Sequence, residues 1–128
     1  MKQENNKKLK ILVIDDDLTF RKALCEYLIQ KGYRVYPFDN GESAIRKLKE
    51  ETFDVILLDI YMLEMDGLKV LTKIREEKIT TKVIILTAAD GLRVVQESVK
   101  LGADEFITKP FNLNLLIETI EKLTADTR

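Results

Sequence analysis

Five side chains suited to phosphate or metal chemistry stand at, or directly after, the ends of apolar runs. They comprise three aspartates, a threonine and a lysine: Asp15, Asp16, Asp59, Thr87 and Lys109. A continuous apolar run bounded by polar residues is typical of a strand buried on both faces of a parallel sheet. Because ligands bind beside the carboxyl ends of such strands, we expect the five groups to meet at one edge of the sheet.

These residue types favour phosphate chemistry assisted by a divalent cation. Neighbouring carboxylates repel one another, and a hard cation removes that repulsion. Mg²⁺ binds about six oxygens, keeps several waters and needs only one or two carboxylates, so it fits this set better than Ca²⁺ does; Mn²⁺ is a second candidate. Lys109 can pair with one phosphate oxygen, the Thr87 hydroxyl can donate to another, and an aspartate can form an aspartyl-phosphate.

Each candidate also has a simpler interpretation. The chain contains no histidine, which removes histidine-based triads and zinc sites and leaves carboxylate, hydroxyl and amine. Acids near a helix start can act as caps, and we assign that role to Asp17 while leaving Asp15 and Asp16 for chemistry. Thr87 could be an ordinary hydroxyl at a strand end, and Lys109 a solvated surface lysine.

The elements that would position these groups alternate along the chain. We expect strands at 10–14, 34–38, 53–58, 82–86 and 104–108. A helix follows each strand. The first covers 18–31 and stops at Gly32, the second follows a turn and cap at Asp39-Asn40-Gly41, and the third begins near Gly67. Asp90 and Asn112 can cap the fourth and fifth helices. Five strands alternating with five helices predict an α/β fold, with a parallel sheet, helices on both faces and right-handed crossovers.

The composition is that of one ordinary globular domain. The chain has 128 residues, 45% hydrophobic and 34% charged, with a net charge of −1, so charge gives no reason to expect direct binding to nucleic acid or an anionic membrane. The apolar runs are too short to span a bilayer, and residues 1–8 lack a signal-peptide core. The lone Cys25 cannot form an internal disulfide, so we expect a packing role for it and a cytoplasmic location.

The sequence resembles the receiver domain of bacterial two-component response regulators, including the chemotaxis regulators. The likeness extends from residue 9 to about 123, so residues 1–128 are expected to form a single receiver domain. It is carried by Ile14-Asp15-Asp16-Asp17, Leu57-Leu58-Asp59, Met65-Asp66-Gly67, Leu86-Thr87-Ala88, Gly102-Ala103-Asp104 and Lys109-Pro110-Phe111. The resemblance implies a flavodoxin-like (βα)₅ fold with a five-stranded parallel sheet in the order 2-1-3-4-5.

The resemblance also implies a role for each site residue. Asp59 would be the phosphoacceptor. Asp16, Asp59 and the Tyr61 carbonyl would bind Mg²⁺ directly, and Asp15 would reach it through water. Lys109 would pair with the phosphate and form a cis peptide bond with Pro110. Two residues would act as the conformational switch: Thr87 and Phe106.

One position departs from the family pattern. Leu63 stands where the family usually has proline, which frees the backbone of the loop near Asp59. Tyr61 and Ala89 occupy positions that tune hydrolysis of the phosphate in the family. Ala89 has no group to orient a water and Tyr61 is bulky, so we expect a long-lived phosphoryl group, testable by its decay rate.

As a receiver, the domain would accept phosphate from a sensor histidine kinase, a phosphotransfer protein or a small phosphodonor. It would be no enzyme beyond catalysing its own phosphorylation and dephosphorylation. Phosphorylation would change the surface formed by the fourth helix, the fifth strand and the fifth helix. Leu115 and Val95 would be exposed there, available to a partner or to a second copy in a homodimer. Two alternatives are a pseudo-receiver that only binds partners and a nucleotide-binding or hydrolytic α/β enzyme, although no glycine-rich phosphate loop is present.

Overall fold

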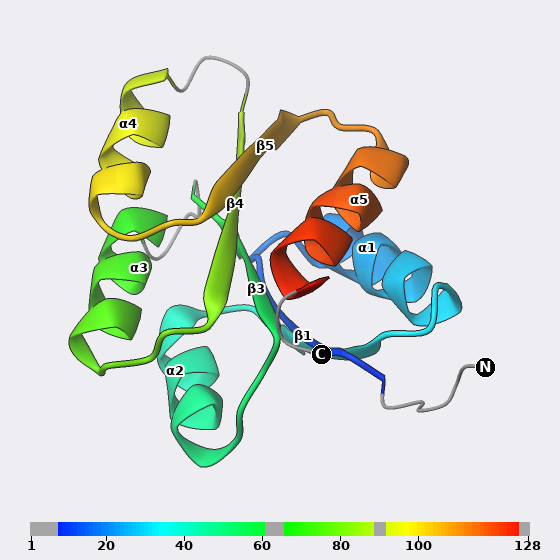
Figure 1. The fold of residues 1–128 in the computed structure, drawn as a ribbon, viewed down its shortest axis with the longest axis horizontal. Helices are drawn as coiled ribbons and strands as arrows, with labels where there is room; N and C mark the ends of the chain where they lie inside the picture. The colour runs from blue at the N-terminus through cyan, green and yellow to red at the C-terminus, as the bar shows by residue number, and fades with distance from the viewer. Residues whose placement is uncertain (1–7, 61–65, 89–91, 126–128) are drawn as a thin grey trace.

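The computed structural model describes residues 8–60, 66–88 and 92–125. Five strands alternate with five helices, as the sequence predicts (Figure 1). In chain order they are β1 (Lys10–Ile14), α1 (Leu18–Gln30), β2 (Arg34–Phe38), α2 (Gly41–Glu50), β3 (Val55–Asp59), α3 (Gly67–Glu76), β4 (Lys82–Ala88), α4 (Leu92–Lys100), β5 (Glu105–Lys109) and α5 (Leu113–Thr124). The strands pair in parallel in the order β2-β1-β3-β4-β5, which confirms the predicted order.

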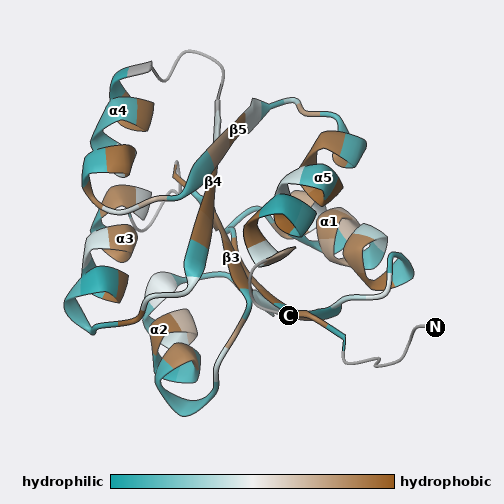
Figure 2. Cartoon of the chain, viewed as in Figure 1, coloured by the Kyte–Doolittle hydropathy of each residue, from teal (hydrophilic) through white to brown (hydrophobic). Residues whose placement is uncertain are grey.

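The sheet separates two apolar cores. Ile11 and Val13 of β1 belong to the core beneath α1 and α5, whereas Leu12 and Ile14 belong to the core beneath α2 and α3. Figure 2 shows apolar residues along the central strands and on the sides of α3 and α4 that face them. Side chains alternate across a strand, so a strand covered on both faces must be apolar at every position. This requirement produces the continuous apolar runs of the sequence.

Two strands begin and end later than the sequence suggests. An aspartate stands just before each: Asp54 before β3 and Asp104 before β5. Each donates its backbone N–H to the neighbouring strand, and its carboxylate accepts the N–H of the same partner, at 2.8 Å from Lys10 N and from Val83 N respectively. The side chain therefore replaces a carbonyl of the ladder. As a result, Asp59 and Lys109 are the last residues of their strands rather than the residues after them.

Helix starts agree with the predicted caps. The side chains of Asp17, Asn40 and Asn112 each accept a backbone N–H in the first turn of the helix that follows, which satisfies a donor that has no partner within the helix. Gly32 follows α1 with a φ of 100°, the left-handed conformation that glycine adopts readily. The predicted cap Asp90 lies outside the described residues.

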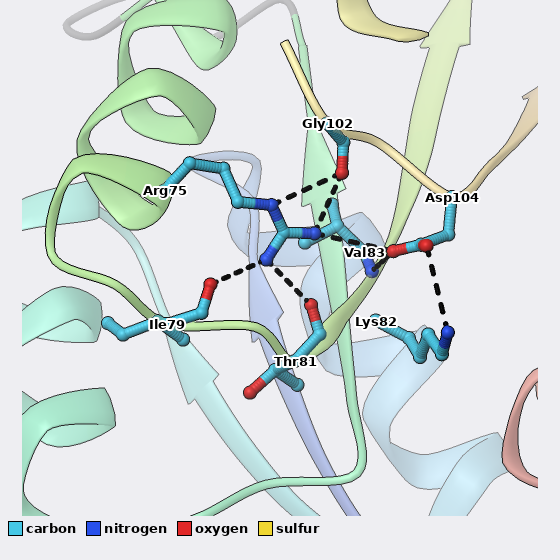
Figure 3. A network of polar contacts seen from close by, with 7 residues as sticks. All are labelled: Arg75, Ile79, Thr81, Lys82, Val83, Gly102 and Asp104. Atoms are coloured by element: carbon cyan, nitrogen blue, oxygen red, sulfur yellow. Dashed lines mark hydrogen bonds and ion pairs between the residues drawn. The ribbon is translucent and has the colours of Figure 1, made fainter.

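A polar network lies at the edge of the sheet where β4 and β5 begin, opposite the strand ends that carry Asp59 and Lys109 (Figure 3). Arg75 of α3 donates to the carbonyls of Gly102 (2.7 Å from Nη2), Ile79 (2.7 Å) and Thr81 (2.9 Å), and Asp104 lies 3.3 Å away. Burial lowers the pKa of Arg75, although the nearby Asp104 opposes this shift. One guanidinium thus ties the end of α3 to the turn before β5. Within the described part of the chain, no helix is long and apolar enough to cross a bilayer.

Candidate metal and phosphate site

Three aspartates converge at the carboxyl edge of the sheet. Asp15 and Asp16 follow β1, and Asp59 ends β3. One carboxylate oxygen from each lies within 4.8 Å of the other two. Asp15 is fully buried and Asp59 is 5% exposed. The sequence prediction that these acids meet is therefore confirmed.

Local contacts fix Asp15 in this position. Its backbone N–H donates to the Phe38 carbonyl of β2 at 3.0 Å, and Oδ1 accepts the Asp17 N–H at 2.9 Å. The Arg21 guanidinium donates to the Asp15 carbonyl at 2.7 Å. These contacts hold the backbone of Asp15 and one carboxylate oxygen, while the other oxygen, Oδ2, lies 3.5 Å from Lys109 Nζ.

Lys109 brings a positive charge between two of the acids. Its Nζ lies 3.5 Å from Asp15 Oδ2 and 3.6 Å from Asp59 Oδ2, and its side chain is 27% exposed. The alternation of side chains along each strand explains why Lys109 meets these two acids. Asp15, Asp59 and Lys109 continue the alternation of Val13, Leu57 and Ile107, which face the α1–α5 side of the sheet. The interpretation of Lys109 as a free surface lysine is wrong.

An aromatic residue from α1 completes the surroundings of Lys109. Lys109 Nζ lies 4.1 Å from the centroid of the Phe20 ring, within the range of a cation–π contact. Phe20 also meets Phe111, with ring centroids 6.0 Å apart and planes at 89°. This contact is not evident from the sequence, where Phe20 fits the apolar stripe of α1. A signal for it exists in retrospect, since the first turn of α1 must lie beside the Asp15 strand end.

Thr87 and Phe106 occupy the other face of the sheet. Thr87 is fully buried in β4 and stands one residue beyond Leu86, the partner of Asp59 in the register. Phe106 pairs with Ile85 of β4 and is 44% exposed, so its side chain is not buried in the hydrophobic core. The alternation of side chains puts Thr87, Ile85 and Phe106 on the same face.

The predicted surface of α4, β5 and α5 contains exposed apolar side chains, but the prediction was wrong for one of them. Leu115 of α5 is 47% exposed, as expected, but Val95 of α4 is only 8% exposed. Val95 lies one turn from the fully buried Ser98, whose hydroxyl donates to the Val95 carbonyl at 2.8 Å, so this side of α4 faces inward. The exposed valine of α4 is Val99, at 58%.

The backbone of Asp59 and Ile60 comes so close to the start of α3 that Gly67 has no room for a side chain. A Cβ on Gly67 would lie 2.5 Å from Ile60 Cα and 2.6 Å from the Asp59 carbonyl oxygen. The Gly67 N–H donates to the Ile60 carbonyl at 3.0 Å. Gly67 therefore fixes the backbone next to Asp59. The predicted ligand Tyr61, and the positions Leu63 and Ala89, lie outside the described residues.

The acid cluster suits a small hard cation. Two oxygens that both bind Mg²⁺ at about 2.1 Å can be at most about 4.2 Å apart. The 4.8 Å limit on the cluster is close to that value, so a small side-chain rotation or one water-mediated contact would accommodate the ion. All three donors are carboxylates, the oxygen ligands that Mg²⁺ and Mn²⁺ prefer. These residues therefore fit the predicted cofactor.

Two further observations agree with the expectations from the sequence. Cys25 is buried and burial raises the pKa of its thiol, as expected of a packing residue rather than a nucleophile. The peptide bond between Lys109 and Pro110 is cis, which the resemblance implied.

Comparisons with known proteins agree with the geometry. Residues 11–121 match the family described as the response regulator receiver domain. The transcriptional regulatory protein ZraR of Salmonella typhimurium is 36% identical over 94% of this chain and 27% of its own length. CiaR of Streptococcus pneumoniae is 36% identical over 90% of this chain and 51% of its own. This chain thus spans about a quarter to a half of these relatives.

Solved structures are similar over nearly all of the chain. The receiver domain of the Francisella response regulator 1452 superposes with a TM-score of 0.87 at 31% identity, covering 94% of this chain and all of that one. The Vibrio cholerae chemotaxis protein CheY4 superposes with a TM-score of 0.85 at 28% identity, covering 91% of this chain and 99% of that one.

Proposed function

Because this chain belongs to the response regulator receiver domain family of two-component systems, we propose that Asp59 accepts a phosphoryl group in a Mg²⁺-dependent reaction. The observation that carries the proposal is the meeting of Asp15, Asp16 and Asp59 within 4.8 Å, beside Lys109. Single acids at strand ends are common, but an acid cluster with a paired lysine provides both a cation site and a phosphate contact.

Each side chain has a definite task in this reaction. An Asp59 carboxylate oxygen attacks phosphorus, an oxygen–phosphorus bond forms, and the bond to the donor breaks with its electron pair leaving on the donor. The donor is a phosphohistidine of a sensor kinase or phosphotransfer protein, or a small acyl phosphate such as acetyl phosphate, which leaves as acetate. Lys109 then pairs with a phosphoryl oxygen. Asp16 and Asp59, with the Tyr61 carbonyl as a third ligand and Asp15 through water, would hold the Mg²⁺ that the family resemblance implies. The ion would supply positive charge to neutralise the phosphoryl oxygens.

The same chemistry supplies a conformational signal. The new phosphoryl oxygens attract the hydroxyl of Thr87. The shift of Thr87 leaves space on the same face of the sheet for Phe106, which is 44% exposed in this structure. A local change in charge would thus bias a two-state element. The responding surface is α4, β5 and α5, where Val99 and Leu115 are exposed and available to an output partner or to a second copy of the chain.

Labelling tests the proposal. Wild-type protein incubated with acetyl phosphate and Mg²⁺ should gain one acid-stable, base-labile phosphoryl group, detected as a mass increase, and the gain should vanish with EDTA or in Asp59→Asn. Lys109→Ala should label much more slowly, because it removes the cation that pairs with the phosphoryl group. Absence of labelling in the wild type would favour the alternative of a pseudo-receiver that acts only by binding partners.

A further inference from the structure

We propose that Phe20 is a positioning residue for phosphoryl transfer, holding the ammonium of Lys109 over the acid cluster with the face of its ring. The inference rests on the proposed function, since it concerns the rate at which Asp59 is phosphorylated. Phe20 touches neither phosphate nor metal in this scheme. It acts only through Lys109.

Lys109 needs such a support. A lysine side chain has four flexible bonds and loses considerable rotamer freedom when it is fixed. Its Nζ is 3.5 and 3.6 Å from the two carboxylates, which is beyond the usual length of a charge-assisted hydrogen bond. With 27% of its side chain exposed, water competes for the ammonium. The Phe20 ring, 4.1 Å from Nζ, adds a third contact from a third element.

This contact is shorter than its counterparts. Other lysines lie over aromatic rings in the described part of the chain, at distances from 4.6 to 5.7 Å. Those pairs lie away from the acid cluster. Among these described pairs, the closest approach of an ammonium to a ring therefore occurs at the lysine on which the proposed chemistry depends.

Phe20 is itself held in place. Its backbone N–H donates to the capping carboxylate of Asp17 at 3.1 Å, so the first turn of α1 is fixed relative to the strand end that carries Asp15. The perpendicular ring of Phe111 packs against it. Phe20 thus contacts the residue before Pro110 and the residue after it, and orients the segment that carries Lys109.

A ring is a suitable support for this task. A third carboxylate would attract Lys109 as well, but it would compete with the incoming phosphoryl group for the same charge and would repel that group. The negative face of an aromatic ring attracts the cation without carrying a net charge. Lys109 is therefore kept near the reacting oxygen and remains available to the phosphate.

Substitutions at Phe20 separate the ring's electrostatic effect from its packing. Phe20→Leu keeps an apolar side chain but has no ring face, so the rate of Asp59 labelling by acetyl phosphate at saturating Mg²⁺ should fall about fivefold, the value of a cation–π contact of ordinary strength. Phe20→Tyr, which keeps a ring face, should label at the wild-type rate. Pentafluorophenylalanine at this position keeps the shape but inverts the ring's charge distribution, and should label as slowly as the leucine variant.

A matched control lies at the opposite edge of the sheet. There the ring of Phe53 lies 4.6 Å from Lys10 Nζ, so Phe53→Leu deletes the same kind of contact away from the acids and should leave the labelling rate unchanged. A second measurement needs no phosphate. The Hε protons of Lys109 should show an upfield ring-current shift in NMR spectra of the resting protein, present in the wild type and Phe20→Tyr and lost in Phe20→Leu.

The outcomes are distinguishable. Equal rates for wild type and Phe20→Leu would overturn the role of Phe20 while leaving the proposed function intact. The same holds if Phe20→Tyr labels as slowly as Phe20→Leu, or if the fluorinated ring labels at the wild-type rate, since packing alone would then explain the loss. A wild type that takes no label would overturn the proposed function, and the role of Phe20 with it.

Discussion

Replacing Gly67 with alanine sets two physical effects against each other. Alanine is favoured over glycine within a helix by up to about 1 kcal/mol, which would stabilise α3. A Cβ at this position, however, would lie 2.5 Å from Ile60 Cα, 2.6 Å from the Asp59 carbonyl oxygen and 2.8 Å from the Ile60 carbonyl oxygen. All three are backbone atoms, which cannot rotate aside as the end of a side chain can.

The steric effect should dominate. Overpacking of this kind costs about 1–3 kcal/mol, and Gly67 is the first residue of α3, where the gain in helix propensity is smallest. We expect Gly67→Ala to lower the free energy of unfolding by about 2 kcal/mol, which for a chain of this length lowers Tm by about 7 °C. Because the displaced atoms adjoin the Asp59 side chain, the rate of labelling by acetyl phosphate should fall as well.

Thermal unfolding followed by circular dichroism, together with the labelling rate, measures both effects. Gly32→Ala is the matched control. Gly32 has a φ of 100°, and no heavy atom lies within 4 Å of the position that an alanine methyl would occupy there. Alanine at this residue should therefore cost about 1 kcal/mol from backbone strain alone and leave labelling unchanged. If Gly67→Ala melts at or above the wild-type temperature and labels at the wild-type rate, the steric reasoning is wrong.

Three further predictions concern residues outside the acid cluster. Arg75→Lys should lower the free energy of unfolding by about 2 kcal/mol, because an ammonium cannot reach all the carbonyls that the planar guanidinium serves; unchanged urea unfolding would contradict this. Hydrogen bonds from Lys10 and Lys47 lower the pKa of Glu51 from 4.5 to about 2, so the stability that this group adds is complete above pH 4.5 and lost as the pH falls toward 2. Unfolding measured across that range should therefore show a smaller acid loss in Glu51→Gln than in the wild type, and equal losses would refute the assignment. Cys25, whose pKa is raised by burial, should react with a thiol reagent at pH 8 roughly tenfold or more slowly in the folded protein than in urea, and equal rates would show that it is accessible.

The sequence by itself determined the elements and the acids that could carry chemistry. Continuous apolar runs indicated strands covered on both faces, and the caps Asp17, Asn40 and Asn112 were predicted because such side chains act within a few residues of their own position. The acids could be placed at one edge because the ends of parallel strands coincide there. Strand order is different: periodicity does not determine which strands are neighbours, and the order came from the resemblance to receiver domains.

Only the tertiary structure decided the contacts between distant segments. The approach of Lys109 to Phe20, the closeness of Gly67 to the Asp59 backbone and the Arg75 network all join residues that local patterns describe merely as apolar, small or charged. The inward rotation of Val95 was missed for the same reason, since the sequence of α4 does not specify which side of that helix meets the sheet. A repeat of hydrophobicity shows how an element is divided between buried and exposed sides, but the register and rotation that bring two elements together depend on packing across the whole core.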